Sequence, residues 1–132
     1  MSTQVVLLVE PDQAAGDALR TALTEKVAPS GGVRVYPVGS GAEALRYLRG
    51  VKPNLIVLDL ELPDMDGLEL CRRLRYDLDL RRVPVLAVSG LTPVEEVRER
   101  AMAAGGTRFL ARPVDLDLFA DEVRALLSAE GR

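Results

Sequence analysis

Short apolar runs alternate with longer amphipathic segments along almost all of this 132-residue chain, and this alternation constrains the fold more than any other feature. The runs are rich in branched side chains, whereas in the segments between them apolar residues recur every three or four positions. The first pattern is typical of a buried β-strand and the second of an α-helix with one buried face. Because five such pairs follow one another, the sequence predicts five strand–helix units.

The predicted strands lie at Val5–Val9, Val33–Val38, Leu55–Leu58, Val83–Val88 and Arg108–Ala111. Three of them are almost wholly apolar, as strands covered on both faces are. The second strand differs, because Arg34, Tyr36 and Pro37 stand between its valines. A half-exposed strand that contains proline is typical of a sheet edge.

The predicted helices span about Gln13–Val27, Gly41–Arg49, a segment from Gly67 that includes Leu78, a segment from Pro93 to the glycines at 105 and 106, and about Asp115–Ala129. Asp12 is placed to cap the first helix and Thr92 to cap the fourth. Strands and helices that alternate at this length indicate a parallel sheet with right-handed crossovers and helices on both faces. We therefore expect one doubly wound α/β domain over residues 1–132.

Composition excludes several classes of function. The chain has no histidine, which removes the usual imidazole base and zinc ligand, and its single cysteine, Cys71, has no partner for a disulfide. Its 17 basic and 20 acidic residues are spread along the chain, so we expect no direct binding to nucleic acid. The five-residue apolar run near the N-terminus is too short to span a membrane. We expect a cytoplasmic protein that is not an enzyme.

Polar side chains follow four of the predicted strands. Glu10 and Asp12 come after the first, Asp59 and Glu61 after the third, Ser89 after the fourth, and Arg112 after the fifth. In a doubly wound sheet, functional groups gather beyond the carboxyl ends of the strands. Packing of the apolar runs does not require these polar groups, so their convergence at one edge predicts a site.

Each of these residues also has a simpler structural role open to it. Glu10 and Asp12 could cap the first helix and interact favourably with its dipole. Asp59 could be a solvated turn residue, and Ser89 could bond only to the loop backbone. The stem of Arg112 could cover apolar surface.

The segment from Pro53 to Gly67, PNLIVLDLELPDMDG, resembles the phosphoacceptor strand and Pro-x-x-Asp-Gly loop of the receiver domain of bacterial two-component response regulators. Two further segments, Val83–Ser89 and Ala104–Pro113, resemble the fourth and fifth strands of that family and their ends. The resemblance covers nearly the whole chain. It implies a flavodoxin-like (βα)5 fold with the strand order 2-1-3-4-5.

The same resemblance implies that Asp59 accepts a phosphoryl group from a histidine kinase or a phosphotransfer protein. It places Ser89 and Arg112 against that group and makes Phe109 the aromatic residue that moves together with Ser89. It also implies a cis peptide bond before Pro113, which proline alone makes inexpensive. A downstream protein or a second copy of the chain would bind through the fourth helix, the fifth strand and the fifth helix.

A magnesium ion at Asp59 is also implied, but here the chain departs from the family pattern. Pro11 stands where the family has the second of two consecutive acids, and a proline side chain cannot bind a metal. The remaining candidate ligands are the carboxylates of Glu10, Asp12 and Asp59 and the backbone carbonyl of Glu61. Because Mg2+ demands near-octahedral geometry, we expect weak binding.

A second departure is Arg112, which replaces the family's lysine before proline. Arginine is a planar fork suited to bidentate pairing, whereas lysine is a point charge. Arg112 could clamp a phosphoryl group, or could pair with Asp59 in place of a metal.

Two functions therefore stay open. One is a phosphorylatable switch, and the other is a pseudo-receiver that binds proteins without phosphorylation. A flavin enzyme with the same fold is disfavoured, because no phosphate-binding loop follows the first strand.

Overall fold

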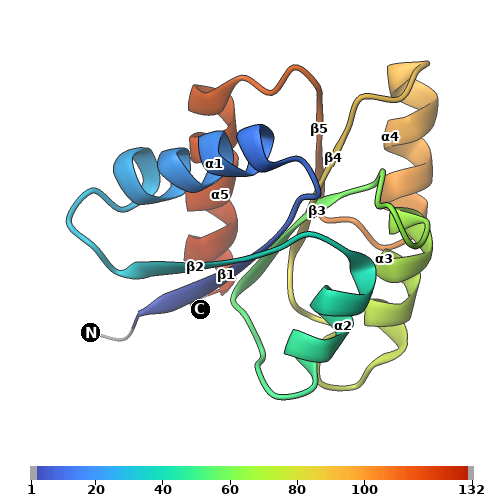
Figure 1. Ribbon diagram of the computed structural model, residues 1–132, viewed down its shortest axis with the longest axis horizontal. Coiled ribbons are helices and arrows are strands. Elements are labelled where there is room, and N and C mark those ends of the chain that lie inside the picture. Colours follow the sequence, from blue (N-terminus) through green and yellow to red (C-terminus); the bar gives the residue numbers. More distant parts are fainter. Residues whose placement is uncertain (1–2, 131–132) are drawn as a thin grey trace.

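The computed structural model describes residues 3–130, which form a five-stranded parallel sheet with helices packed on both faces (Figure 1). The strands are β1 (Gln4–Val9), β2 (Val33–Val38), β3 (Leu55–Asp59), β4 (Val85–Ser89) and β5 (Arg108–Ala111). Their order across the sheet is β2-β1-β3-β4-β5, and every neighbouring pair is parallel. The predicted doubly wound fold and its strand order are confirmed.

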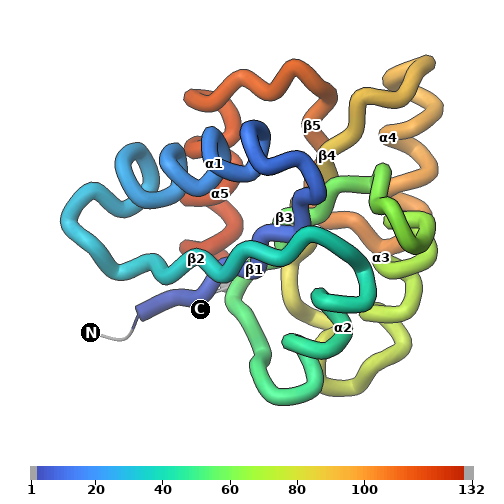
Figure 2. Tube along the Cα trace, viewed as in Figure 1, coloured from blue at the N-terminus to red at the C-terminus, as the bar shows by residue number. Residues whose placement is uncertain are grey.

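The helices are α1 (Gln13–Ala22), α2 (Gly41–Leu48), α3 (Gly67–Tyr76), α4 (Val94–Ala103) and α5 (Leu116–Glu130). A π-helical segment, η1 (Leu23–Val27), continues α1, so the predicted first helix has the right extent but a widened last turn. The trace in Figure 2 shows α1 and α5 on one side of the sheet and α2, α3 and α4 on the other. None of the helices in residues 3–130 is long and apolar enough to cross a membrane.

Alternation along the strands creates two hydrophobic cores, one on each face of the sheet. Leu7 and Val9 of β1 pack with residues of α2, α3 and α4, while Val6 and Leu8 pack with residues of α1, η1 and α5. All four side chains are at most 1% exposed. Successive side chains of a strand point to opposite faces, so a strand that is covered twice must be apolar throughout.

The predicted edge strand is confirmed. Within residues 3–130, β2 pairs with β1 alone, and its burial alternates over its first four residues. Tyr36 is 47% exposed, and its ring lies 4.2 Å from that of Tyr47 on α2, centroid to centroid. This arrangement leaves the four other strands to carry the polar edge of the sheet.

The boundaries of β3 and β4 differ from the predicted ones in a way that matters for the site. β4 begins at Val85 rather than Val83, because Pro84 has no N–H to give to the ladder. β3 runs on through Asp59, which pairs with Val88 of β4. Asp59 is therefore the last residue of a central strand rather than a turn residue.

Two details of the predicted helices are wrong. The third helix does not include Leu78, which is 80% exposed, because Asp77 takes an extended conformation and its side chain accepts the N–H of Asp79 in a tight turn. Thr92 does not cap the fourth helix, whose N-cap is Pro93 without a side-chain cap.

Gly67, the first residue of α3, packs directly against the chain that leaves β3. Its N–H donates to the carbonyl of Leu60 at 3.1 Å, and a Cβ built on Gly67 would lie 2.5 Å from the Cα of Leu60. That distance is shorter than any ordinary contact, and the atom it meets is backbone. Only glycine permits this approach, which fixes the path of the segment just after Asp59.

We predict that Gly67→Ala lowers the free energy of unfolding by about 2 kcal/mol or more, because the backbone must move to admit a methyl group. Urea unfolding followed by circular dichroism measures the change. Gly50→Ala is the matched control, since nothing lies within 4 Å of a Cβ at that position. Equal stability of the two variants would contradict the close packing of Gly67.

Candidate functional site

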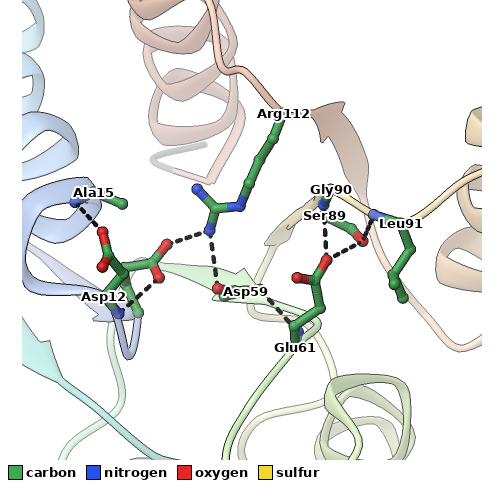
Figure 3. Close-up of polar contacts among 9 residues, drawn as sticks. Asp12, Ala15, Asp59, Glu61, Ser89, Gly90, Leu91 and Arg112 are labelled. Carbon is green, nitrogen blue, oxygen red and sulfur yellow. Dashed lines mark hydrogen bonds and ion pairs between the residues drawn. The ribbon is translucent and has the colours of Figure 1, made fainter.

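Asp59 lies at the carboxyl end of β3 with only 5% of its side chain exposed. Its Oδ1 accepts the backbone N–H of Glu61 at 2.8 Å, which fixes the orientation of the carboxylate. Its Oδ2 faces the end of β5 (Figure 3). The strand thus presents one carboxylate oxygen in a fixed position at the edge of the sheet.

Arg112 joins the ends of three strands. Its Nη2 lies 2.9 Å from Oδ2 of Asp59 and also donates to Oε1 of Glu10. The Arg112 side chain is 25% exposed, whereas that of Glu10 is 2% exposed. A buried carboxylate needs a partner for its charge, and one guanidinium nitrogen serves both carboxylates. The pairing of Arg112 with Asp59, one of the two roles predicted for this arginine, is what the structure contains.

The charges of this cluster do not balance, since two carboxylates share one guanidinium. Burial and, to a smaller extent, the nearby carboxylate of Glu10 raise the pKa of Asp59 from its ordinary value of 3.8 to about 6. The N–H of Glu61 and the charge of Arg112 act against this rise. Burial lowers the pKa of Arg112, but its pairing with Glu10 and Asp59 outweighs burial and the net shift is upward.

Asp12 lies apart from the cluster and caps α1. Its Oδ2 accepts the N–H of Ala15 at 2.8 Å, as expected from the simpler of its two predicted roles. Glu10 does not cap the helix in this way, because its Oε2 accepts the N–H of Asp12 and its Oε1 pairs with Arg112. The two acids at the end of β1 therefore serve different purposes.

Receiver domains generally hold Mg2+ at the phosphorylation site, but the side chains of this chain, as placed, do not fit the ion. Asp12 is engaged with its helix, and the Arg112 cation lies between Glu10 and Asp59. Among residues 3–130 no group of three or more acidic, histidine or cysteine side chains is arranged to hold a metal. A guanidinium nitrogen occupies the space between carboxylates that a cation would need.

Ser89 and Glu61 form a second polar group beside the first. The Ser89 hydroxyl donates to Oε1 of Glu61 at 3.1 Å, and the N–H of Gly90 donates to the same oxygen at 2.8 Å (Figure 3). The sequence predicts a role only for the backbone carbonyl of Glu61 and does not predict the contacts that its carboxylate makes. Its spacing was the available signal, because a residue two positions after Asp59 points to the same side of an extended chain.

Phe109 and Pro113 lie beyond the polar cluster. Phe109 is 5% exposed and pairs with Ala87, two residues before the end of β5, with the guanidinium carbon of Arg98 5.1 Å from its ring centroid. The peptide bond between Arg112 and Pro113 is cis, which confirms that prediction. The structure therefore brings together Glu10, Asp59 and Arg112, with Ser89 on Glu61 beside them, and leaves Asp12 and Phe109 outside.

Comparison with known proteins connects this geometry to a family. The profile of the response regulator receiver domain matches residues 6–124. The chain is 29% identical over 125 residues to the polar-differentiation response regulator DivK of Brucella ovis, which covers 95% of this chain and 97% of that protein. It is 34% identical over 122 residues to the response regulator MprA of Mycobacterium ulcerans, covering 92% of this chain and 49% of that protein.

Solved structures agree with the sequence relatives. The signal receiver domain of a signal transduction histidine kinase from Syntrophus aciditrophicus superposes with a TM-score of 0.84 at 32% identity, over 96% of this chain and 92% of that one. The signal receiver domain of a DNA-binding response regulator from Colwellia psychrerythraea gives a TM-score of 0.85 at 24% identity, over 95% of this chain and 98% of that one. The second likeness shows the fold alone.

We predict that Asp59→Asn stabilises the fold at pH 8 by about 1 to 2 kcal/mol, after allowing for solvent screening. A raised pKa means that folded Asp59 binds its proton more tightly than the unfolded chain does. Stability from this group is therefore fully present below the unfolded pKa and is lost as the pH rises through about 6. Because asparagine cannot ionise, the variant keeps this stability, and its free energy of unfolding exceeds that of the wild type increasingly over the same pH range. Urea unfolding at pH 4 to 8 measures it.

Asp64→Asn is a control of opposite sign. The pKa of Asp64 is lowered, because its carboxylate accepts the N–H groups of Gly41 and Ala42. Stability from this group is present above its unfolded pKa and is lost as the pH falls, so the variant should be less stable than the wild type at neutral pH. An Asp59→Asn variant whose stability relative to the wild type stays constant or falls as the pH rises from 4 to 8 would contradict the charge imbalance.

Proposed function

Because the chain belongs to the response regulator receiver family, we propose that Asp59 takes a phosphoryl group from a histidine kinase or a phosphotransfer protein and thereby switches a partner-binding face. Receiver domains are signalling modules. The observation that carries the proposal is the orientation of Asp59, whose Oδ1 is held by the N–H of Glu61 while its Oδ2 points to Arg112. A nucleophile fixed in one orientation loses little freedom when it reacts.

The transfer itself would proceed in line at Oδ2 of Asp59. As the bond from this oxygen to phosphorus forms, the phosphorus–nitrogen bond of the donor phosphohistidine breaks, and the imidazole nitrogen keeps the electron pair and takes up a proton. Arg112 must leave Oδ2 for this to happen. Its planar fork then faces the phosphoryl oxygens, whose negative charge it partly neutralises.

The response would reach partners through α4, β5 and α5. Phe109 is buried beneath this face, and the guanidinium of Arg98 on α4 lies over its ring. A shift at the end of β5 would therefore move side chains that are packed up to the surface. Met102 of α4 and Leu118 of α5 are 44% and 46% exposed. A downstream protein or a second copy of the chain would bind here. A cytoplasmic location, where a kinase domain would meet it, stays a prediction.

A pseudo-receiver is the second candidate, and one specific observation favours it. Arg112 already bridges Glu10 and Asp59, so the cluster has an internal cation without any phosphoryl group or metal. In this role the chain would bind its partner through the same fold with Asp59 permanently paired. The two candidate functions differ in whether Arg112 leaves Oδ2 of Asp59 so that this oxygen can react.

We predict that incubation with acetyl phosphate adds one phosphoryl group to the protein, with acetate as the leaving group. Intact-mass spectrometry measures the gain, which Asp59→Asn should abolish. Asp64→Asn is the matched control, since Asp64 is exposed, lies in the loop after β3 and should leave the gain unchanged. No gain at high donor and Mg2+ concentrations, together with no spectral response to beryllofluoride, would rule out the switch and support the pseudo-receiver.

Pro11→Asp tests the metal expectation separately. The variant supplies a carboxylate directly after Glu10. In the wild type the two acids nearest this position already have partners, because Asp12 caps α1 and Glu10 pairs with Arg112. We predict that it binds Mg2+ about tenfold or more tightly than the wild type, as titration calorimetry would measure. Pro29→Asp, in the loop between η1 and β2, is the control and should bind as the wild type does. Unchanged affinity in Pro11→Asp would mean that Arg112 keeps the pocket closed to metals.

A further inference from the structure

The end of β4 carries two hydrogen-bond donors that converge on one oxygen. The hydroxyl of Ser89 and the N–H of Gly90 both donate to Oε1 of Glu61, at 3.1 and 2.8 Å (Figure 3). The hydroxyl oxygen of Ser89 accepts the N–H of Leu91 at 3.0 Å. Ser89 is fully buried, whereas Glu61 is exposed to solvent.

These contacts use up the donors of this strand end. A serine hydroxyl has one proton and a backbone amide has one, and both are given to the same carboxylate oxygen. Convergent donors of this kind, one of them a backbone N–H, make an anion-binding site. The anion in this site is supplied by the chain itself, from two residues beyond Asp59.

The donor pair belongs to the same polar edge as Asp59 and Arg112. The backbone N–H of Arg112 donates to the carbonyl of Ser89 at 2.9 Å. A Cβ built on Gly90 would lie 3.5 Å from Cδ of Arg112 and 3.7 Å from Oε1 of Glu61. Gly90 therefore lies close to both the Arg112 stem and the Glu61 carboxylate, and Ser89 directly follows Val88, the residue of β4 that pairs with Asp59.

We propose that Glu61 is an internal competitor for the phosphoryl group, holding the donors of Ser89 and Gly90 until a phosphoryl group on Asp59 displaces it. The displacement of Glu61 by a phosphoryl group rests on the proposed function. The hydrogen bonds of Glu61 to Ser89 and Gly90 in the unmodified chain do not depend on it. A second negative charge at this position also repels an incoming phosphoryl group. Because Glu61 is exposed, its side chain has room to swing into water when it is displaced.

The competition gives Glu61 a positioning role in the switch. Ser89 is drawn toward an anion in the unmodified chain as well as in the modified one, so phosphorylation changes which anion it binds. The free energy released by binding the phosphoryl group is reduced by the contacts that Glu61 loses. Residue 61 thus sets how readily the chain accepts and keeps an anion at Asp59.

We predict two effects of Glu61→Ala. Hydrogen exchange of the Gly90 amide, followed by NMR at neutral pH, should accelerate about tenfold or more, because its charged acceptor is gone. Binding of beryllofluoride, read from the Gly90 amide signal, should become about tenfold tighter, because no carboxylate competes. Glu61→Gln keeps the size of the side chain without its charge and should fall between the wild type and Glu61→Ala in both measurements.

Glu69→Ala is the matched control. Glu69 is an exposed acid on α3 that pairs with Arg72 at 3.3 Å, away from the donors of β4, and its loss should change neither measurement. Equal beryllofluoride affinity in the wild type and Glu61→Ala, or no binding in either, would overturn the competition, as would unchanged exchange of Gly90. The proposed function fails on a different result, namely no mass gain from acetyl phosphate in the wild type and in Glu61→Ala alike.

Discussion

The ion pair of Arg112 with two buried carboxylates is the interaction on which the polar edge of this protein depends. Glu10 and Asp59 come from neighbouring parallel strands, and the sheet register brings them close whether or not their charges are compensated. Removing one member of a buried ion pair is strongly destabilising, because the other charge then stays buried without compensation. Arg112, delivered by β5 from the other side of β4, supplies the compensation, so the ends of three strands are held by one side chain.

A single guanidinium leaves the cluster one negative charge in excess, and this imbalance shapes its chemistry. The raised pKa of Asp59 follows from burial beside Glu10, with Arg112 opposing it only in part. The same arginine fits a phosphoryl group as well as a carboxylate, because its fork matches both. The cluster can therefore exchange a carboxylate for a phosphoryl group at Arg112, whereas a divalent cation would have to displace the guanidinium that lies between Glu10 and Asp59.

Strand geometry explains why one short segment supplies so much of the site. The extended chain through Asp59 and Glu61 points both carboxylates toward the same edge, with Leu60 turned into the core between them. Gly67 then lets the chain fold back against Leu60. Asp59 is thereby fixed toward Arg112 and Glu61 toward the donors of Ser89 and Gly90, two contacts made by residues only two positions apart.

Residue patterns along the chain were enough to predict the order and type of the strands and helices, the edge position of β2, and the convergence of polar residues at one end of the sheet. These follow from hydrophobic periodicity and from the rule that parallel strands share one carboxyl edge, both of which are local or topological. The pairing of the polar groups depends instead on how the strands are arranged in space. Asp12 turned to its helix, Arg112 to Glu10 and Asp59, and Glu61 to Ser89, because the choice among partners depends on distances of a few ångströms between separate strands, which no pattern within one segment encodes.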